Sequence, residues 1–335
     1  MNCLKKNQKK SDKWVKLICG ASNEDIISIE DLCAVYSAAG VDYIDVAAEQ
    51  SIVQAARNGI KWSEEYFGSS PGLMISISDG KDIHFRKAKF DPLMCPENCP
   101  RPCEKICPTF AIDHHGIQES KCYGCGRCIN SCPLNLISEY EYNLSKDDLP
   151  STLKKTQPDA VEIHTEINRI DSFVKVVNIL KNSKTKLKKI SVSCGLNQSP
   201  KAPKDPEDLL EALWERYEIL SALNIPLIWQ LDGRPMSGDL APTAGRDAVK
   251  LFKKIGSHLP PGLIQLAGGT NGQTHEFLNT NNFPDGIAFG SSARKIMQPF
   301  IEFANKNNKR LYDYPESMEL AIKKAQTLLN PWKIF

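Results

Sequence analysis

The sequence has no long apolar run and no marked excess of charge. None of its apolar stretches approaches the roughly eighteen residues of a membrane span, and its formal net charge is only +2, with charged residues making up 24% of the chain. These values give no reason to expect an integral membrane protein or a nucleic-acid partner. The first residues carry lysines but not the apolar stretch of a secretory signal, so we expect a flexible basic tail over residues 1–13 and a cytoplasmic protein.

Familiar catalytic signatures are missing as well. The chain contains no H-E-x-x-H and no P-loop, we find no Ser/His/Asp set in it, and no G-x-G-x-x-G follows its first apolar run. The C-x3-C-x2-C spacing of radical enzymes that cleave S-adenosylmethionine does not occur either. We therefore predict no catalytic residues and do not expect a conventional enzyme.

Cysteine, in contrast, is abundant and concentrated. Eight of the twelve cysteines lie in two runs between residues 95 and 133, and each run ends in Cys-Pro. The second run has the C-x2-C-x2-C-x3-C-P spacing of a bacterial-type ferredoxin half, in which three cysteines bind one iron–sulfur cluster and the fourth reaches the other. In the first run all three gaps contain three residues, so the first two are one residue longer. We expect Pro96, Pro100 and Pro102 to hold this run extended rather than helical.

The spacing predicts two iron–sulfur clusters, with the [4Fe-4S] type favoured, and a soluble electron carrier as a partner. Crossed ligation, as in two-cluster ferredoxins, divides the ligands into one set of Cys107, Cys122, Cys125 and Cys128 and another of Cys95, Cys99, Cys103 and Cys132. Disulfides are a poorer explanation because they belong to oxidising compartments and small secreted domains. Structural zinc is also poorer, because it prefers separated cysteine pairs or cysteine–histidine mixtures.

Outside the cysteine runs the chain alternates between short apolar runs and amphipathic helical periods. We interpret eight of the runs as strands that are apolar on both faces, as expected of a parallel sheet covered by helices. These candidate strands are 14–19, 43–46, 73–77, 160–164, 189–194, 226–231, 263–267 and 286–289. The pattern predicts an eightfold β/α barrel, with an open doubly wound sheet as the alternative.

The predicted barrel is interrupted after its third strand. Residues 14–90 form its first part, residues 91–140 form a ferredoxin-like insertion, and residues 141–335 form the remainder with a closing helix. We expect the polar stretch 139–151 to be the return linker. The insertion then stands at the C-terminal mouth of the barrel, where barrel active sites are built.

Glycine-rich loops follow the seventh and eighth predicted strands. Barrels often bind phosphate between these two loops, through backbone amides and a helix N-terminus. The candidate ligand-binding residues are Gly268, Gly269, Gly290, Ser291 and Arg294, and flavin mononucleotide or another phosphorylated ligand would suit them. The alternative is that these glycines only serve tight turns that need a positive φ.

Three other cysteines and two histidines are expected to have structural rather than catalytic roles. Cys19 and Cys194 end the first and fifth predicted strands, and Cys33 lies on an apolar helical face, so all three are expected in the core. His84 and His164 are of the type that acts as acid or base. Without a defined partner, we expect both to be satisfied surface or core histidines.

Five segments of the chain resemble the cyanobacterial light-dependent period protein A family. They are LICGASNED, CPENCPRPCEKICP, CYGCGRCINSCP, QLDGRPMSGD and LAGGTNGQT, and the similarity extends over essentially the whole chain. The resemblance implies an iron–sulfur protein that passes light, sensed as cellular redox state, to the circadian clock. It also implies clock or clock-input proteins as partners in the cytoplasm, and it carries the cluster ligands onto the same eight cysteines.

Three functions remain open on the sequence alone. The first is a redox sensor whose clusters exchange electrons with a soluble carrier and alter the barrel mouth or a partner surface. The second is an iron–sulfur oxidoreductase that passes electrons to a flavin or a phosphorylated substrate at the barrel mouth. In the third, the clusters only hold a long insertion together.

Overall fold

The computed structural model describes residues 13–196, 205–233, 241–279 and 282–333. Eight parallel strands form a closed barrel in the order β1-β12-β11-β10-β9-β8-β3-β2. The predicted barrel is therefore confirmed, and the open sheet is wrong. The barrel strands are β1 (Trp14–Gly20), β2 (Tyr43–Ala47), β3 (Gly72–Ser78), β8 (Ala160–His164), β9 (Lys189–Gly195), β10 (Leu227–Asp232), β11 (Leu263–Ala267) and β12 (Gly286–Phe289).

Two segments discussed above lie largely outside the described residues. They are the N-terminal tail, of which only Lys13 is described, and most of the loop QLDGRPMSGD, whose residues 234–240 are not described. Within the described residues, no helix is long and apolar enough to cross a membrane.

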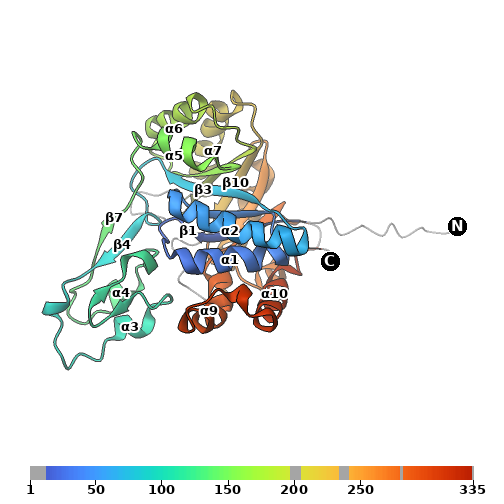
Figure 1. Cartoon of the computed structure of the whole chain (residues 1–335). Helices are drawn as coiled ribbons and strands as arrows, with labels where there is room; N and C mark the ends of the chain where they lie inside the picture. The colour runs from blue at the N-terminus through green and yellow to red at the C-terminus, as the bar shows by residue number, and fades with distance from the viewer. Residues whose placement is uncertain (1–12, 197–204, 234–240, 280–281, 334–335) are drawn as a thin grey trace.

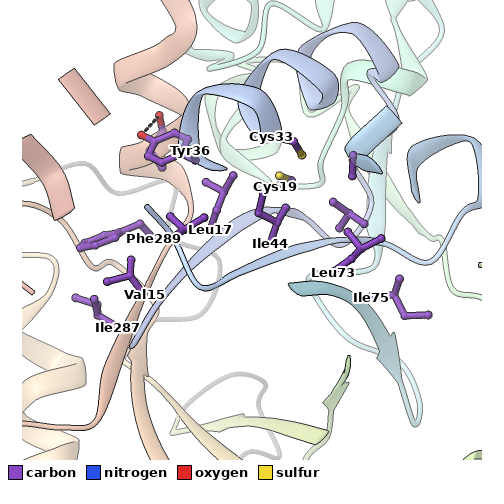
Figure 2. Packing of buried hydrophobic residues seen from close by; sticks show 14 of the residues in the cluster. Val15, Leu17, Cys19, Cys33, Tyr36, Ile44, Leu73, Ile75, Ile287 and Phe289 are labelled. Atoms are coloured by element: carbon purple, nitrogen blue, oxygen red, sulfur yellow. Dashed lines mark hydrogen bonds between the residues drawn. The ribbon is translucent and has the colours of Figure 1, made fainter. Parts of the chain in front are cut away.

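The outer face of the barrel strands packs against a layer of helices (Figure 1). On β1 and β2, for example, Val15, Leu17, Cys19 and Ile44 are fully buried beneath helix α1 and its neighbours (Figure 2). The covering helices are α1 (Ile26–Ala39), α2 (Gln50–Phe67), α5 (Leu149–Thr156), α6 (Ile170–Asn182), α7 (Pro206–Ser221), α8 (Arg246–Ile255), α9 (Ser291–Lys306) and α10 (Pro315–Leu329). Short 3-10 turns lie at Gly256–His258, Thr274–Phe277 and Leu311–Asp313.

Helix α1 shows how local sequence sets these boundaries. Asp25 caps its start by accepting a hydrogen bond from the Ser28 amide at 3.2 Å. Gly40 ends it with a φ of 99°, a left-handed conformation that favours glycine. Inside the helix, the Tyr36 hydroxyl donates to the carbonyl of Ala293 at 3.0 Å, which ties α1 to α9 (Figure 2). Cys33 packs beside Cys19, and Cys194 is buried in the same core, so all three occupy the expected core positions.

The inner face of the strands differs from the prediction, which took both faces as apolar. An apolar layer formed by Tyr43, Met74, Ala160 and Ile228 fills one level of the barrel interior. The next level is polar and includes Lys16, Glu162 and Gln230, all at most 2% exposed. Because side chains alternate along a strand, these polar residues lie between apolar neighbours that face the helices. Their burial is possible because they hydrogen-bond to one another.

The insertion leaves the barrel after β3 and forms a separate lobe (Figure 1). An antiparallel ribbon of β4 (Arg86–Lys89) and β7 (Ser138–Glu141) connects the lobe to the barrel. We call residues 86–141 the cysteine module. Between the ribbon strands it contains η1 (Pro92–Met94), α3 (Pro102–Ile106), β5 (Ile112–Asp113), β6 (Gly116–Ile117), η2 (Glu119–Lys121) and α4 (Arg127–Ser131).

The stretch predicted as a return linker, 139–151, is not an irregular linker throughout. It contains most of β7 and the start of α5. The error arose because β7 is polar and exposed, so its sequence has no apolar alternation, and only pairing with β4 identifies it as a strand. The predicted limits of the insertion, 91–140, fall just after β4 and inside β7.

Candidate functional site

The cysteines of the module lie on two short helices and the loops beside them. Cys103 is in α3 and Cys128 is in α4, while Cys107 and Cys132 follow directly after these helices, which pack against each other. The prediction that prolines keep the first run extended is wrong at its end, since Pro102 begins α3. Proline suits the first position of a helix, because the amide it lacks would have no partner there.

The eight thiols fall into two groups of mutual neighbours. Burial, together with the nearby Cys125, Cys122 and Cys107, raises the pKa of Cys128 to about 12. In the other group, burial raises the pKa of Cys103, and the neighbouring thiols of Cys132 and Cys95 also raise it. Cys99 lies next to Cys95 in the same group. The structure thus brings together one group of Cys107, Cys122, Cys125 and Cys128 and a second of Cys95, Cys99, Cys103 and Cys132.

The spacing within these groups suits a cluster better than a single ion. Among the residues that the structure describes, no three cysteine sulfurs lie within 4.8 Å of one another. Four sulfurs around one zinc ion would be about 3.8 Å apart, because each lies at about 2.3 Å from the metal. None of the module cysteines forms a disulfide. The donor set therefore fits iron–sulfur clusters, which several thiolates hold at their corners.

Backbone groups of the module already point at two of the sulfurs. The amide of Ala111 donates to Sγ of Cys107 at 3.2 Å, and the amide of Ala88 donates to Sγ of Cys122 at 3.4 Å. Such hydrogen bonds stabilise a thiolate and tune the potential of a cluster. Ala88 belongs to β4, so the ribbon helps to build the group that contains Cys122.

A cavity of about 80 Å³ opens at the mouth of the barrel. All five residues predicted for ligand binding contribute to its lining, namely Gly268, Gly269, Gly290, Ser291 and Arg294. Helix α9 begins at Ser291, so its N-terminal amides lie at the cavity wall. The Nε atom of Arg294 is buried and has no hydrogen-bond partner among the described residues.

One residue of the cysteine module reaches the same cavity. Tyr123 lies between Cys122 and Cys125, is only 7% exposed and lines the cavity wall. The guanidinium of Arg294 stacks on its ring at 4.2 Å from the centroid, while Nη1 of Arg294 donates to the carbonyl of Ile18 at 2.8 Å. The loop that carries two cysteines is thus in direct contact with the rim of the barrel.

The floor of the cavity is a buried polar network. Lys16 forms an ion pair with Glu162, which also accepts hydrogen bonds from Ser191 and Gln230, both at 2.9 Å. Burial alone would raise the pKa of Glu162, but Lys16 and His164 hold it below its usual value. Asp45 lacks such a close cation, and burial raises its pKa although Ser76 donates a hydrogen bond to it.

His84 and His164 come together at the cavity, although the sequence indicated no partner for either. Their ring centroids are 4.9 Å apart, and each has a carboxylate partner. Nδ1 of His84 lies 2.8 Å from Asp82, and Nε2 of His164 lies 3.3 Å from Glu162. Burial would lower the pKa of His164, but Glu162 and Asp82 raise it to about 9. The missed signal is the pair of Asp-x-His and Glu-x-His segments, which place both side chains on one face.

Two domain families match the chain. The light dependent period A C-terminal domain matches residues 152–331, and the LdpA Fe-S cluster-binding domain matches residues 95–143. The protein named light dependent period A of Synechococcus elongatus is 38% identical over 329 residues, which cover 96% of this chain and 91% of that protein. The chain belongs to the light dependent period A family.

Two shorter similarities are to ferredoxin-type proteins. An uncharacterized ferredoxin of Methanocaldococcus jannaschii is 28% identical over 93 residues, covering 25% of this chain and 55% of that protein. The iron–sulfur subunit of the arsenate respiratory reductase of a Shewanella species is 30% identical over 86 residues, covering 24% and 32%. With the matched cluster-binding domain, they make this member of the light dependent period A family an iron–sulfur protein.

Among solved structures, the tryptophan synthase alpha subunit of Legionella pneumophila aligns with a TM-score of 0.42 and 10% identity. The alignment covers 96% of this chain and 92% of that subunit. At this level of similarity nothing follows for the function of a light dependent period A protein.

Proposed function

We propose that the chain is a redox sensor that relays light-dependent cellular redox state to the circadian clock, with two [4Fe-4S] clusters in the cysteine module. Cys107, Cys122, Cys125 and Cys128 hold one cluster, and Cys95, Cys99, Cys103 and Cys132 hold the other. The grouping of the thiols and the two hydrogen bonds to sulfur support this assignment. Such clusters supply one-electron transfer at potentials that their surroundings tune.

The contact between Tyr123 and Arg294 carries the proposal, because it joins the cysteine loop to the barrel mouth. One added negative charge at roughly 10 Å acts on a cation with about 1.7 kcal/mol when the effective dielectric is about 20. This energy changes a two-state equilibrium by more than tenfold. The electrostatic energy of reduction at the Cys122–Cys128 group is therefore large enough to reposition Arg294 and the start of α9.

The experiment compares backbone hydrogen exchange in the oxidised protein and in the protein reduced with dithionite without oxygen. We expect reduction to change exchange at residues 290–298. The change should persist in Tyr123→Phe, which keeps the ring and the charge of Arg294, and should disappear in Arg294→Gln, which removes the cation. Iron and acid-labile sulfide are counted in each sample, so that loss of a cluster is not taken for loss of coupling. If reduction leaves hydrogen exchange in the wild-type protein unchanged, the redox-sensor proposal is contradicted.

The proposed partners are a soluble electron carrier and clock or clock-input proteins in the cytoplasm. Support for the carrier comes from the apolar side chains that the module exposes beside its cysteines. They include Leu93 at 92%, Met94 at 63% and Phe110 at 53% exposed. Exposed apolar groups of this kind mark contact surfaces, and electron transfer needs the two redox centres close together.

A second candidate function is an iron–sulfur oxidoreductase acting on a flavin or a phosphorylated substrate. The observation that favours it is that the predicted phosphate-binding residues and Tyr123 line one cavity. A volume of about 80 Å³ is below the roughly 300–1,000 Å³ of ordinary ligand pockets, so a small phosphorylated compound suits it better than a flavin. Titration of the purified protein with inorganic phosphate and with flavin mononucleotide, compared with Arg294→Gln, tests this function. Absence of binding to either ligand would remove its support.

A further inference from the structure

Three side chains with metal-binding atoms converge at the mouth of the barrel, apart from the cysteine groups. They are Asp82, His84 and His164, whose carboxylate oxygen and ring nitrogens all lie within 4.8 Å of one another. In the described part of the chain, no other group of three histidine, cysteine, aspartate or glutamate ligand atoms is as compact. Asp82 and His164 are each 6% exposed.

The fold holds these three residues from two adjacent strands. His164 ends β8, and Asp82 and His84 lie on the segment that leaves β3, which pairs with β8 through Ser78 and His164. The amide of Asp79 donates to the carbonyl of His164 at 3.1 Å, so the segment stays close to the end of β8. The Asp82 carboxylate accepts a hydrogen bond from the backbone amide of His84 at 2.8 Å. The Ser22 hydroxyl donates a hydrogen bond to the carbonyl of His84 at 3.2 Å.

The charge around this group favours a cation. Asp232, Glu162 and Asp45 line the cavity together with the two histidines. With Asp82, these residues supply four carboxyl groups, whereas the basic side chains are Lys16, which pairs with Glu162, and Arg294 at the rim. The carboxyl groups around the two histidines therefore outnumber the ammonium and guanidinium groups near them.

We propose that Asp82, His84 and His164 form a binding site for one divalent first-row metal ion, such as Fe²⁺, Mn²⁺ or Zn²⁺. Two imidazoles and one carboxylate are a donor set that suits these ions and leaves other coordination positions open. The open positions face the cavity, because His84 and His164 both line it. The neighbouring Arg294 suits a small carboxylate or phosphate as an additional ligand of the ion. Glu162 accepts from His164 and orients its ring, as carboxylates do behind metal-bound histidines.

This site is independent of the eight cysteines, and its test must not count cluster iron. Mn²⁺ is therefore the probe. The intact protein, with its clusters oxidised, is exchanged into metal-free buffer and titrated with Mn²⁺, while the electron paramagnetic resonance signal of free Mn²⁺ is followed. We expect one Mn²⁺ per chain and nitrogen modulations from bound imidazole in pulsed spectra. Added Zn²⁺ should release the Mn²⁺.

Variants locate the site. His84→Ala and Asp82→Asn should each weaken Mn²⁺ binding at least tenfold, while His258→Ala, at an exposed position of the barrel, should leave it unchanged. Unchanged iron and sulfide counts, together with an unchanged far-ultraviolet circular dichroism spectrum, show that each variant is folded. If a variant fails to fold, the pulsed spectra of the wild type still decide the question. Absence of binding, bound Mn²⁺ without imidazole nitrogen, or full affinity in both variants would overturn the proposal.

Discussion

At the scale of single residues, the cysteine loop is built around a glycine that no other residue can replace. Gly124 has a φ of 71°, and a Cβ atom at this position would lie 2.1 Å from the carbonyl oxygen of Arg86 in β4. Nε of Arg86 in turn donates to the carbonyl of Gly124 at 3.0 Å. The backbone of the loop therefore rests directly on the ribbon, with Cys122 and Cys125 on either side.

We predict that Gly124→Ala loses about half of the bound iron and sulfide, because displacing the loop removes one of the two proposed clusters, the one assigned to Cys122, Cys125, Cys128 and Cys107. Gly68→Ala is the matched control, since Gly68 has a similar φ of 67° but its Cβ would meet nothing within 4 Å. The control should cost only the roughly 1–2 kcal/mol of a left-handed residue and keep its iron. Equal iron contents in the two variants would show that the close contact does not matter for the cluster.

A second prediction at this scale concerns Asp31, a carboxyl group buried beneath the C-terminal region. Burial raises its pKa to about 7, although the Leu311 amide donates to it and Arg310 lies nearby. A raised pKa stabilises the fold below the usual value of 3.8, and this contribution is lost as the pH rises to about 7. Asp31→Asn removes this pH dependence of stability, because the asparagine side chain does not titrate. Relative to wild type, its free energy of unfolding should improve by on the order of 2 kcal/mol between pH 5 and pH 8.

Urea unfolding followed by tryptophan fluorescence at the two pH values measures this difference. A constant offset between Asp31→Asn and wild type would show that Asp31 does not titrate with folding.

At the scale of elements, α1 and α2 pack closely against each other. Gly59 makes this close packing possible, because a Cβ at this position would lie 2.3 Å from the carbonyl oxygen of Glu30 and 2.8 Å from the amide nitrogen of Ala34. Both contacts are to backbone atoms of α1, so no side-chain movement relieves them. The two helices must move apart to admit even a methyl group.

We predict that Gly59→Ala destabilises the protein by about 1–3 kcal/mol, the usual cost of overpacking, despite the better helix propensity of alanine. Glu64→Ala, at an exposed position of the same helix, is the control and should change stability by less than about 0.5 kcal/mol. Urea midpoints of the three proteins supply the comparison. A stabilised Gly59→Ala would mean that propensity outweighs the helix contact.

At the scale of the whole molecule, the barrel and the cysteine module have separate cores of very different size. The barrel core extends through all eight strands and the covering helices. The module core consists of a few small or medium side chains, three of them cysteines, and includes Ala88, Ala111, Ile112 and Ile137. So little apolar burial cannot order a module of this length without bound metal.

We therefore predict that removal of iron with a chelator unfolds the module and leaves the barrel folded. Trypsin should then cut at Lys105, Lys121 or Arg127, while the two barrel fragments stay associated because β3 and β8 remain paired. Far-ultraviolet circular dichroism should retain most of its helical signal, and size-exclusion chromatography should show one species. Simultaneous loss of the barrel signal and of iron would contradict this independence.

The sequence alone determined the features that depend on neighbours in the chain. The eight strands, the insertion after the third strand and the two cysteine runs follow from alternation, helical period and spacing, and helix ends such as Gly40 follow from local backbone preference. The polar residues inside the strands were visible too, but their meaning depended on knowing which face closes into the barrel. Only the tertiary structure decided that Tyr123 meets Arg294, and that Asp82 and His84 meet His164. Closure of the barrel brings the ends of distant strands to one mouth, and no local pattern encodes which of their side chains then touch.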